Sequence, residues 1–186
     1  YDSIAFGMGV GVSEDIYKII GFLLKNYSGK LLIDADGLNT IAKYGVEILK
    51  EKKCQVVLTP HIREFARLVG LDKNEVLNGS IELAKKFATE YNVVLNLKNA
   101  KSIITDGKEV IINTSGCSGM AKAGSGDVLS GITVGLLARS DNALESTAIA
   151  AYIFGKAGEH AQKKDCEFTV TATDIISALP CVIKSL

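Results

Sequence analysis

The chain has 186 residues and 47% of them are hydrophobic, so it is long enough to bury a substantial core within a single domain. Basic and acidic residues balance at 21 each, and without a long basic run the composition argues against nucleic acids and membranes as partners. The four cysteines and two histidines lack the spacing of a zinc site or of a Cys-x-x-Cys pair, which favours a reducing, cytoplasmic location.

Short apolar strands alternate with helical patterns over the first half of the chain. This alternation is typical of βαβ units, in which helices cover both faces of a parallel sheet. We therefore predict an α/β fold with a mostly parallel sheet, forming one domain over residues 1–186. The expected strands are Ser3–Phe6, Leu31–Ile33, Val56–Leu58 and Val93–Leu97, and the expected helices are one capped by Ser13, Leu38–Tyr44, Ile62–Val69 and one capped by Ser80 that reaches Tyr91.

The second half of the chain does not continue this alternation of strands and helices. Asp106 and Gly107 separate two strand-like runs, Lys101–Thr105 and Lys108–Ile112, and form the signal of a two-residue hairpin turn. Two antiparallel strands should therefore join the sheet here. The remainder has helical patterns, and the expected helices are Asp127–Arg139, Ala143–Lys164 and a short C-terminal helix that is capped near Thr173 and ends before Pro180.

Glycines and polar residues gather around the ends of the predicted strands. In open α/β sheets, ligands bind beyond the carboxyl ends of the strands, so these segments are the candidates for a functional site. The four segments are Gly7–Gly11, Asp34–Asn39, Thr59–Glu64 and Gly116–Asp127.

The segment Gly116–Asp127 carries the strongest signal. Its glycines allow the backbone to approach a ligand closely, and the helix that follows begins with N–H groups that bind anions such as phosphate. A carboxylate in that first turn repels a bound phosphate, so the useful role for Asp127 is to accept the proton of a substrate hydroxyl. The residues alone leave a second interpretation open, in which Asp127 only caps the helix and the glycines only form a tight turn.

Several other polar residues have two interpretations each. Asp34 and Asp36 either bind Mg²⁺ through water or cap the following helix, and Asn39 has the same two interpretations. Glu64 either contacts a metal-bound water or simply lies in a first helical turn, where the helix dipole favours a carboxylate. Lys98 either pairs with phosphate or is a solvated lysine at a strand end.

Five motifs follow one another along the chain. The clearest is Gly119–Gly131, with the sequence Gly-Met-Ala-Lys-Ala-Gly-Ser-Gly-Asp-Val-Leu-Ser-Gly, followed by Gly-Leu-Leu-Ala at 135–138. The others are Gly-Met-Gly-Val-Gly at 7–11, Asp-Ala-Asp-Gly-Leu-Asn at 34–39, Thr-Pro-His at 59–61 with Glu64, and Leu97-Lys98. In this order the motifs resemble the ADP/ATP-dependent NAD(P)H-hydrate dehydratases, a ribokinase-like family. The resemblance covers essentially the whole chain and implies that the family domain continues upstream of Tyr1.

The resemblance implies a ribokinase-like fold and a reaction in two parts. A nucleotide, ADP or ATP with Mg²⁺, phosphorylates the ring hydroxyl of hydrated NADH or NADPH, and phosphate then leaves to restore the nicotinamide. Asp127 matches the catalytic aspartate, which takes the hydroxyl proton. The expected substrate-binding residues are Gly9, His61, Asn39, Glu64 and Asp127, and the expected nucleotide-binding residues are Lys98, Asn99, Ala100, Lys101, Ser102, Gly124, Ser125 and Gly126.

Two other functions are weighed against this one. Another ribokinase-like kinase, acting on hydroxyethylthiazole or a sugar, would share Gly124–Asp127, but the motifs at 34–39 and 59–64 argue against it. A nucleotide-binding module without catalysis belongs to a different class. We also expect a homo-oligomer, although the apolar helix over 143–158 suits a core position as well as a subunit contact.

Overall fold

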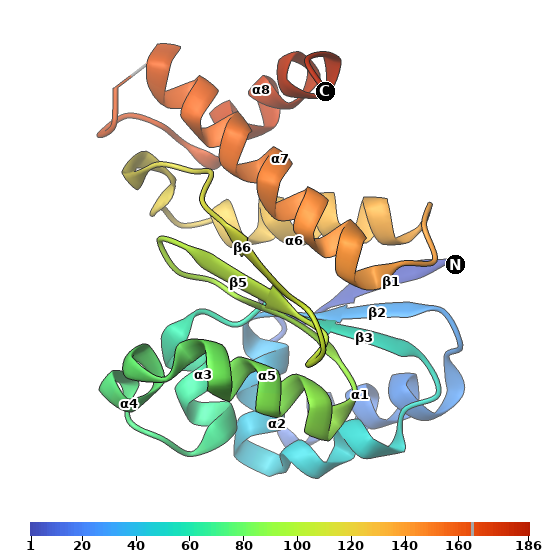
Figure 1. Cartoon of the computed structure of the whole chain (residues 1–186). Helices are drawn as coiled ribbons and strands as arrows, with labels where there is room; N and C mark the ends of the chain where they lie inside the picture. The colour runs from blue at the N-terminus through green and yellow to red at the C-terminus, as the bar shows by residue number, and fades with distance from the viewer. Residues whose placement is uncertain (165) are drawn as a thin grey trace.

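The computed structural model describes residues 1–164 and 166–186, and its centre is a six-stranded sheet with helices on both faces (Figure 1). In order across the sheet the strands are β1 (Ser3–Phe6), β2 (Lys30–Ile33), β3 (Gln55–Leu58), β4 (Val94–Leu97), β5 (Ser102–Thr105) and β6 (Val110–Asn113). The strands β1 to β4 pair in parallel, whereas β4 with β5 and β5 with β6 pair antiparallel. The predicted mostly parallel sheet with an added hairpin is confirmed.

Two groups of helices cover the two faces of the sheet (Figure 1). The first group is α1 (Glu14–Asn26), α2 (Asp36–Tyr44), the 3₁₀ helix η1 (Val46–Glu51), α3 (Ile62–Val69), α4 (Lys73–Asn78) and α5 (Ser80–Tyr91). The second group is the short 3₁₀ helix η2 (Ser118–Met120), α6 (Ser125–Leu137), α7 (Ala143–Lys164) and α8 (Ala172–Lys184). None of the helices among the described residues has the length and apolarity of a membrane span.

Alternating side chains of the strands build a core on each face. In β2, Leu31 and Ile33 pack in the core shared with α1 to α5, whereas Leu32 packs in the core shared with α6 and α7. Successive residues of a strand point to opposite faces, so the side chain of Asp34, which follows β2, is directed to the α6 side. This orientation brings a carboxylate under α6 at the carboxyl end of the sheet.

The hairpin between β5 and β6 differs from the predicted two-residue turn. Thr105 pairs with Val110, so residues 106–109 form the loop. The carboxylate of Asp106 accepts the backbone N–H groups of Lys108 and Glu109, each at 2.9 Å. The longer loop is stable because this side chain satisfies the loop amides that a tight turn would have paired with the backbone.

The C-terminal helix α8 also differs from its prediction. It is capped by Thr171 instead of Thr173, because Thr171 and Asp174 form a reciprocal capping box. The helix continues through Pro180 to Lys184, where we expected an end before the proline. Its apolar side packs against α7, and this burial outweighs the single hydrogen bond that proline removes.

The segment before α5 holds a helix that the pattern did not predict. The short helix α4 ends at Asn78, and its C-cap Gly79 is also the N-cap of α5, so the predicted cap at Ser80 is wrong by one residue. The helix η1 was not predicted either. Both elements have only six residues, which leaves little periodicity to detect.

Candidate functional site

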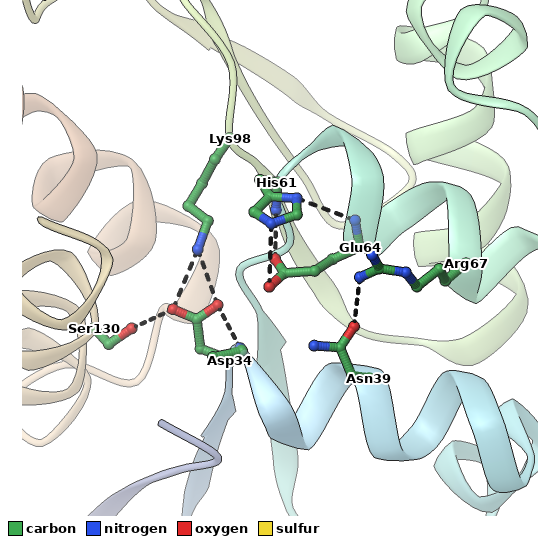
Figure 2. A network of polar contacts seen from close by, with 8 residues as sticks. Asp34, Asn39, His61, Glu64, Arg67, Lys98 and Ser130 are labelled. Carbon is green, nitrogen blue, oxygen red and sulfur yellow. Dashed lines mark hydrogen bonds and ion pairs between the residues drawn. The ribbon is translucent and has the colours of Figure 1, made fainter. Parts of the chain in front are cut away.

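The segments predicted to form a site meet beyond the carboxyl ends of β1 to β4 (Figure 2). Gly37 donates its backbone N–H to the carbonyl of Gly7 at 3.3 Å, and Lys98 donates its own to the carbonyl of Pro60 at 2.8 Å. Parallel strands end at the same edge of a sheet, so the segments that follow them become neighbours. The start of α6 closes this edge, because Gly126 lies against Lys98 and Asp34.

The first turn of α6 presents backbone amides without acceptors. Gly124 is the N-cap, with φ of 85°, and no side chain caps the helix. A residue with a Cβ is strained in this left-handed conformation, which explains a glycine here. Ser125 donates its N–H to Lys122 at 3.3 Å, whereas the amides of Gly126 and Asp127 meet no acceptor among the described residues. These two amides and the helix dipole form a favourable position for an anion.

The carboxylate of Asp127 is exposed in the same turn. It makes no hydrogen bond or ion pair with the described part of the chain, and it does not cap the helix. The alternative in which Asp127 serves only as a cap is therefore wrong. A carboxylate without a hydrogen bond or ion pair to the described residues remains available to a ligand, as a proton acceptor must be.

A buried ion pair lies next to this turn. The ammonium of Lys98 contacts both carboxylate oxygens of Asp34, at 2.9 and 3.2 Å, and the hydroxyl of Ser130 donates to the same carboxylate at 2.9 Å (Figure 2). The Asp34 side chain is 2% exposed and that of Lys98 is 21% exposed. Lys98 is thus not a solvated strand-end lysine. Ser130 was not among the predicted site residues, although its position four residues after Gly126 places it on the same side of α6.

His61 and Glu64 hold the start of α3. The imidazole Nδ1 of His61 accepts the N–H of Glu64 at 3.1 Å, and the Glu64 carboxylate accepts the N–H of His61 at 2.8 Å. Glu64 is buried in the first helical turn, as one of its two interpretations predicts, while the imidazole is half-exposed. Because Nδ1 is an acceptor, the neutral imidazole carries its hydrogen on Nε2, and this nitrogen lies 3.4 Å from the Oε1 of Glu64.

Asn39 on α2 is joined to Arg67 on α3. The guanidinium of Arg67 donates to the side-chain oxygen of Asn39 at 2.8 Å (Figure 2). This bond leaves the Asn39 amide N–H groups for other partners. Arg67 was not predicted from the sequence, although its spacing of three residues from Glu64 places both on one side of α3.

The remaining predicted residues lie on exposed loops around this edge. Gly9 belongs to the loop after β1, and that loop is tied to α2 because Gly11 donates its N–H to Asp36 at 2.9 Å. The residues after Lys98 form a turn in which the Asn99 side chain accepts the N–H of Ala100 at 2.9 Å. The turn ends where the hydroxyl of Ser102 donates to the carbonyl of Asn99 at 3.2 Å, and Lys101 is exposed within it.

The glycine-rich loop before α6 is anchored on α7. Gly116 donates its N–H to Glu159 at 2.9 Å, and Gly119 donates to Gln162 at 3.1 Å. The ammonium of Lys156 also contacts Glu159 at 2.9 Å. Lys156 and the Gly116 amide together hold the pKa of the Glu159 carboxyl below its usual range. An ionised carboxylate and a neutral amide of α7 therefore hold the loop together.

A cavity of about 600 Å³ lies at the opposite end of the sheet, between the amino ends of β3 and β4 and the start of α7. Among its charged side chains, those of Lys52, Asp106 and Asp141 already have partners. Lys52 donates to the carbonyl of Leu49 at 3.2 Å, Asp106 accepts the hairpin amides, and Asp141 pairs with Lys30 at 3.3 Å. The cavity lacks the unpartnered amides and carboxylate found at α6, so we place the functional site at the carboxyl edge.

Comparison with known proteins gives consistent matches. A family model described as NAD(P)H-hydrate dehydratase matches residues 1–181. An ADP-dependent (S)-NAD(P)H-hydrate dehydratase of Cenarchaeum symbiosum is 37% identical, over 98% of this chain and 62% of that protein. A bifunctional NAD(P)H-hydrate repair enzyme of Moorella thermoacetica is 36% identical, over 100% of this chain and 35% of that protein.

A solved structure agrees with these sequence matches. The crystal structure of ADP/ATP-dependent NAD(P)H-hydrate dehydratase from Bacillus subtilis, co-crystallized with ATP/Mg²⁺, superposes with a TM-score of 0.88 at 27% identity. The match covers 100% of this chain and 65% of that one, and it confirms the predicted ribokinase-like fold. The chain thus spans less than two thirds of the length of each of these three relatives.

Proposed function

The chain belongs to the NAD(P)H-hydrate dehydratase family, and we propose that it dehydrates hydrated NADH and NADPH with ADP or ATP as the phosphoryl donor. The relatives' names supply the substrate class and the nucleotide. The site supplies the chemistry, since it offers a position for a phosphate and a carboxylate beside it. Because the chain covers only part of its relatives, the activity of the whole protein is part of the proposal.

The observation that carries the proposal is the first turn of α6. The amides of Gly126 and Asp127 have no acceptor, and the carboxylate of Asp127 has no partner among the described residues. An anion held by these amides lies next to the carboxylate, because both belong to one helical turn. Binding a phosphoryl group and receiving a proton at the same place is what transfer of phosphate to a hydroxyl requires.

The proposed reaction begins with phosphoryl transfer. Asp127 accepts the proton of the ring hydroxyl as the hydroxyl oxygen bonds to the terminal phosphorus and the bond from phosphorus to the nucleotide oxygen breaks. The α6 amides and the ammonium of Lys98 stabilise the charge on the transferred group. Phosphate then leaves with the electron pair of the carbon–oxygen bond, and loss of a proton from the neighbouring ring carbon restores the double bond.

The protein offers Mg²⁺ few ligands of its own. The described residues contain no group of three or more His, Cys, Asp or Glu side chains that would hold a metal. Asp34 is engaged by Lys98, Ser130 and the backbone, whereas Asp36 and Asp127 retain carboxylate oxygens without partners. This donor set fits Mg²⁺ held mainly by phosphate oxygens and water, so that the metal arrives with the nucleotide and lends it positive charge.

The relatives argue against the two rival functions. The family model and the curated relatives are dehydratases, which separates the chain from hydroxyethylthiazole and sugar kinases of the same fold. A nucleotide-binding module without catalysis has no use for an exposed, unpartnered carboxylate at the phosphate position. The homo-oligomer and the cytoplasmic location expected from the sequence stay predictions.

The test is turnover of hydrated NADH by the protein at its natural full length, followed by the return of dihydronicotinamide absorbance with ADP or ATP and Mg²⁺. Asp127→Asn should lower kcat by roughly 100- to 10,000-fold, the usual contribution of a general base. ADP should bind as well as before or more tightly, because the change removes a negative charge beside the phosphate. Asp141→Asn is the matched control, since Asp141 lies at the opposite end of the sheet in an exposed ion pair. Undiminished turnover by Asp127→Asn would refute the catalytic assignment.

A further inference from the structure

Asp34 and Lys98 meet although another strand separates the strands that carry them. Asp34 follows β2, Lys98 follows β4, and β3 lies between. Neighbouring strands are roughly 4.8 Å apart, so the Lys98 side chain extends across the end of β3 to reach the carboxylate. Figure 2 shows the Lys98 ammonium reaching the Asp34 carboxylate. A lysine at a strand end would normally extend into water, so the crossing indicates a specific attraction.

The carboxylate of Asp34 is fully engaged. It accepts two contacts from Lys98, one from the Ser130 hydroxyl at 2.9 Å and one from the Ala35 N–H at 2.9 Å. A carboxylate offers about four acceptor positions, so no position is left for a ligand. Since the side chain is 2% exposed and held from three directions, its position is fixed by the protein. Asp34 therefore acts on the residues around it and not on a bound molecule.

The ammonium of Lys98 is held beside the first turn of α6. A Cβ added to Gly126 would lie 3.7 Å from the Lys98 nitrogen and 3.8 Å from a carboxylate oxygen of Asp34. Ser130 lies four residues further along the same helix, so its bond to Asp34 fixes the side of α6 that faces the ion pair. An ammonium has three donors and Asp34 takes two of them, which leaves one N–H next to the amides of Gly126 and Asp127.

We propose that Asp34 is a positioning residue that holds Lys98 beside the start of α6, so that the remaining ammonium N–H binds the phosphoryl group of the nucleotide. The inference rests on the proposed function for the identity of that group. Charge alone predicts the opposite effect of Asp34, because a carboxylate near a phosphate repels it and its removal should tighten binding. Removal of the Asp34 carboxylate therefore weakens nucleotide binding if Asp34 positions Lys98, and it strengthens binding if Asp34 only repels the phosphate.

The experiment is a double-mutant cycle on ADP binding, measured by titration calorimetry with Mg²⁺ on the protein at its natural full length. Lys98→Met should weaken binding by about 10- to 100-fold, the loss of a charged hydrogen bond to phosphate. Asp34→Asn should weaken it by about 10-fold when Lys98 is present and by less than about 2-fold in the Lys98→Met background. Thermal unfolding of each variant checks that the protein is folded at the temperature of the titration.

Each result decides the proposal. Tighter or unchanged ADP binding by Asp34→Asn overturns it, and so does an equal loss in both backgrounds, because a purely structural role acts without Lys98. If Asp34→Asn does not fold, Ser130→Ala takes its place in the cycle, since it loosens the carboxylate and leaves the ion pair. Ser130→Ala should weaken ADP binding about 3-fold when Lys98 is present and leave ADP binding unchanged in the Lys98→Met background. An equal loss of ADP affinity in the two backgrounds overturns the proposal.

Binding and turnover separate this inference from the proposed function. If the variants of the cycle bind ADP as predicted but the unaltered protein does not dehydrate hydrated NADH, the dehydratase activity is refuted and the role of Asp34 is supported. A protein that dehydrates hydrated NADH while Asp34→Asn binds ADP normally refutes only the role of Asp34. Absence of ADP binding by the unaltered protein overturns both.

Discussion

Replacing Gly126 by alanine should separate the stability of the fold from the binding of phosphate. The residue lies in the first turn of α6, and its position in the helix does not need the left-handed conformation that favours glycine. A Cβ at this position would meet nothing closer than 3.7 Å, which is an ordinary contact distance. The protein without ligand should therefore accept the methyl group. A phosphate on the Gly126 amide should not, because the methyl group lies on the side of Lys98 and Asp34, where the anion is proposed to bind.

The expected changes in stability and in ADP affinity follow from these contacts. Glycine in a helix is about 0.8 to 1.0 kcal/mol less favourable than alanine, and a first-turn position gains part of that amount. Gly126→Ala should thus raise the melting temperature by up to about 3 °C, given roughly 2–4 °C per kcal/mol for a protein of this size. ADP binding should weaken at least about 10-fold, because the amide hydrogen bond to phosphate is lost.

The matched control is Gly131→Ala in the middle of the same helix. Gly131 is exposed, and a Cβ there would meet nothing within 4 Å. This change should raise stability by about 1 kcal/mol and leave ADP binding unaltered. Titration calorimetry with ADP and Mg²⁺ compares the ADP affinities of the two variants, and thermal unfolding compares their melting temperatures.

Two results would refute the reasoning. If Gly126→Ala binds ADP as tightly as the unaltered protein, phosphate does not lie on the first turn of α6. If Gly126→Ala lowers the melting temperature by several degrees while Gly131→Ala raises it, the space around Gly126 is smaller than the structure indicates, and a loss of binding would no longer report on phosphate.

Three further changes test other parts of the structure. Asn96 is fully buried and neither polar atom of its side chain has a partner among the described residues, so Asn96→Leu should raise the free energy of unfolding by about 1–3 kcal/mol. A lower urea midpoint would contradict this. The pKa of Glu159 lies below its ordinary value of 4.5, so its contribution to stability is complete above that pH and is lost as the pH falls through the lower folded value. Glu159→Gln should flatten the acid part of the curve of stability against pH, and an unchanged curve would exclude this role. Gly7→Ala should destabilise by about 3 kcal/mol or more, because φ is +118° and a Cβ would lie 2.2 Å from the carbonyl oxygen of Asp34; an unaltered melting temperature would show this geometry to be wrong.

Local signals in the sequence were sufficient for most of the secondary structure. The cap at Ser13, the strand Ser3–Phe6 and the helix Ala143–Lys164 have the predicted positions. Caps and periodicity depend on residues within one or two turns of each other, so a single sequence contains them. The two failures have different causes, since the local hydrogen bonds of the Asp106 carboxylate lengthened the hairpin loop, whereas the tertiary packing of α8 on α7 carried that helix past Pro180.

The sequence also predicted which segments meet at the candidate site. The glycine-rich motif pointed to the start of α6 and to Asp127, and the rule that ligands bind at the carboxyl ends of strands gathered the other segments at one edge. Their grouping needed only the strand order of an open parallel sheet. The sequence alone left open what Asp34 and Lys98 do, because a carboxylate after a strand suits a metal, a turn or an ion pair equally well.

Tertiary structure decided those partners. Asp34 is 64 positions from Lys98 and 96 positions from Ser130, and the Lys98 ammonium and the Ser130 hydroxyl of α6 both meet its carboxylate. Such contacts depend on the register of three strands and on the rotation of one helix about its axis, and both are fixed by the packing of the two cores. Pattern and motif thus determined the elements and the edge of the sheet where the candidate segments gather, whereas long-range packing determined which charges meet there.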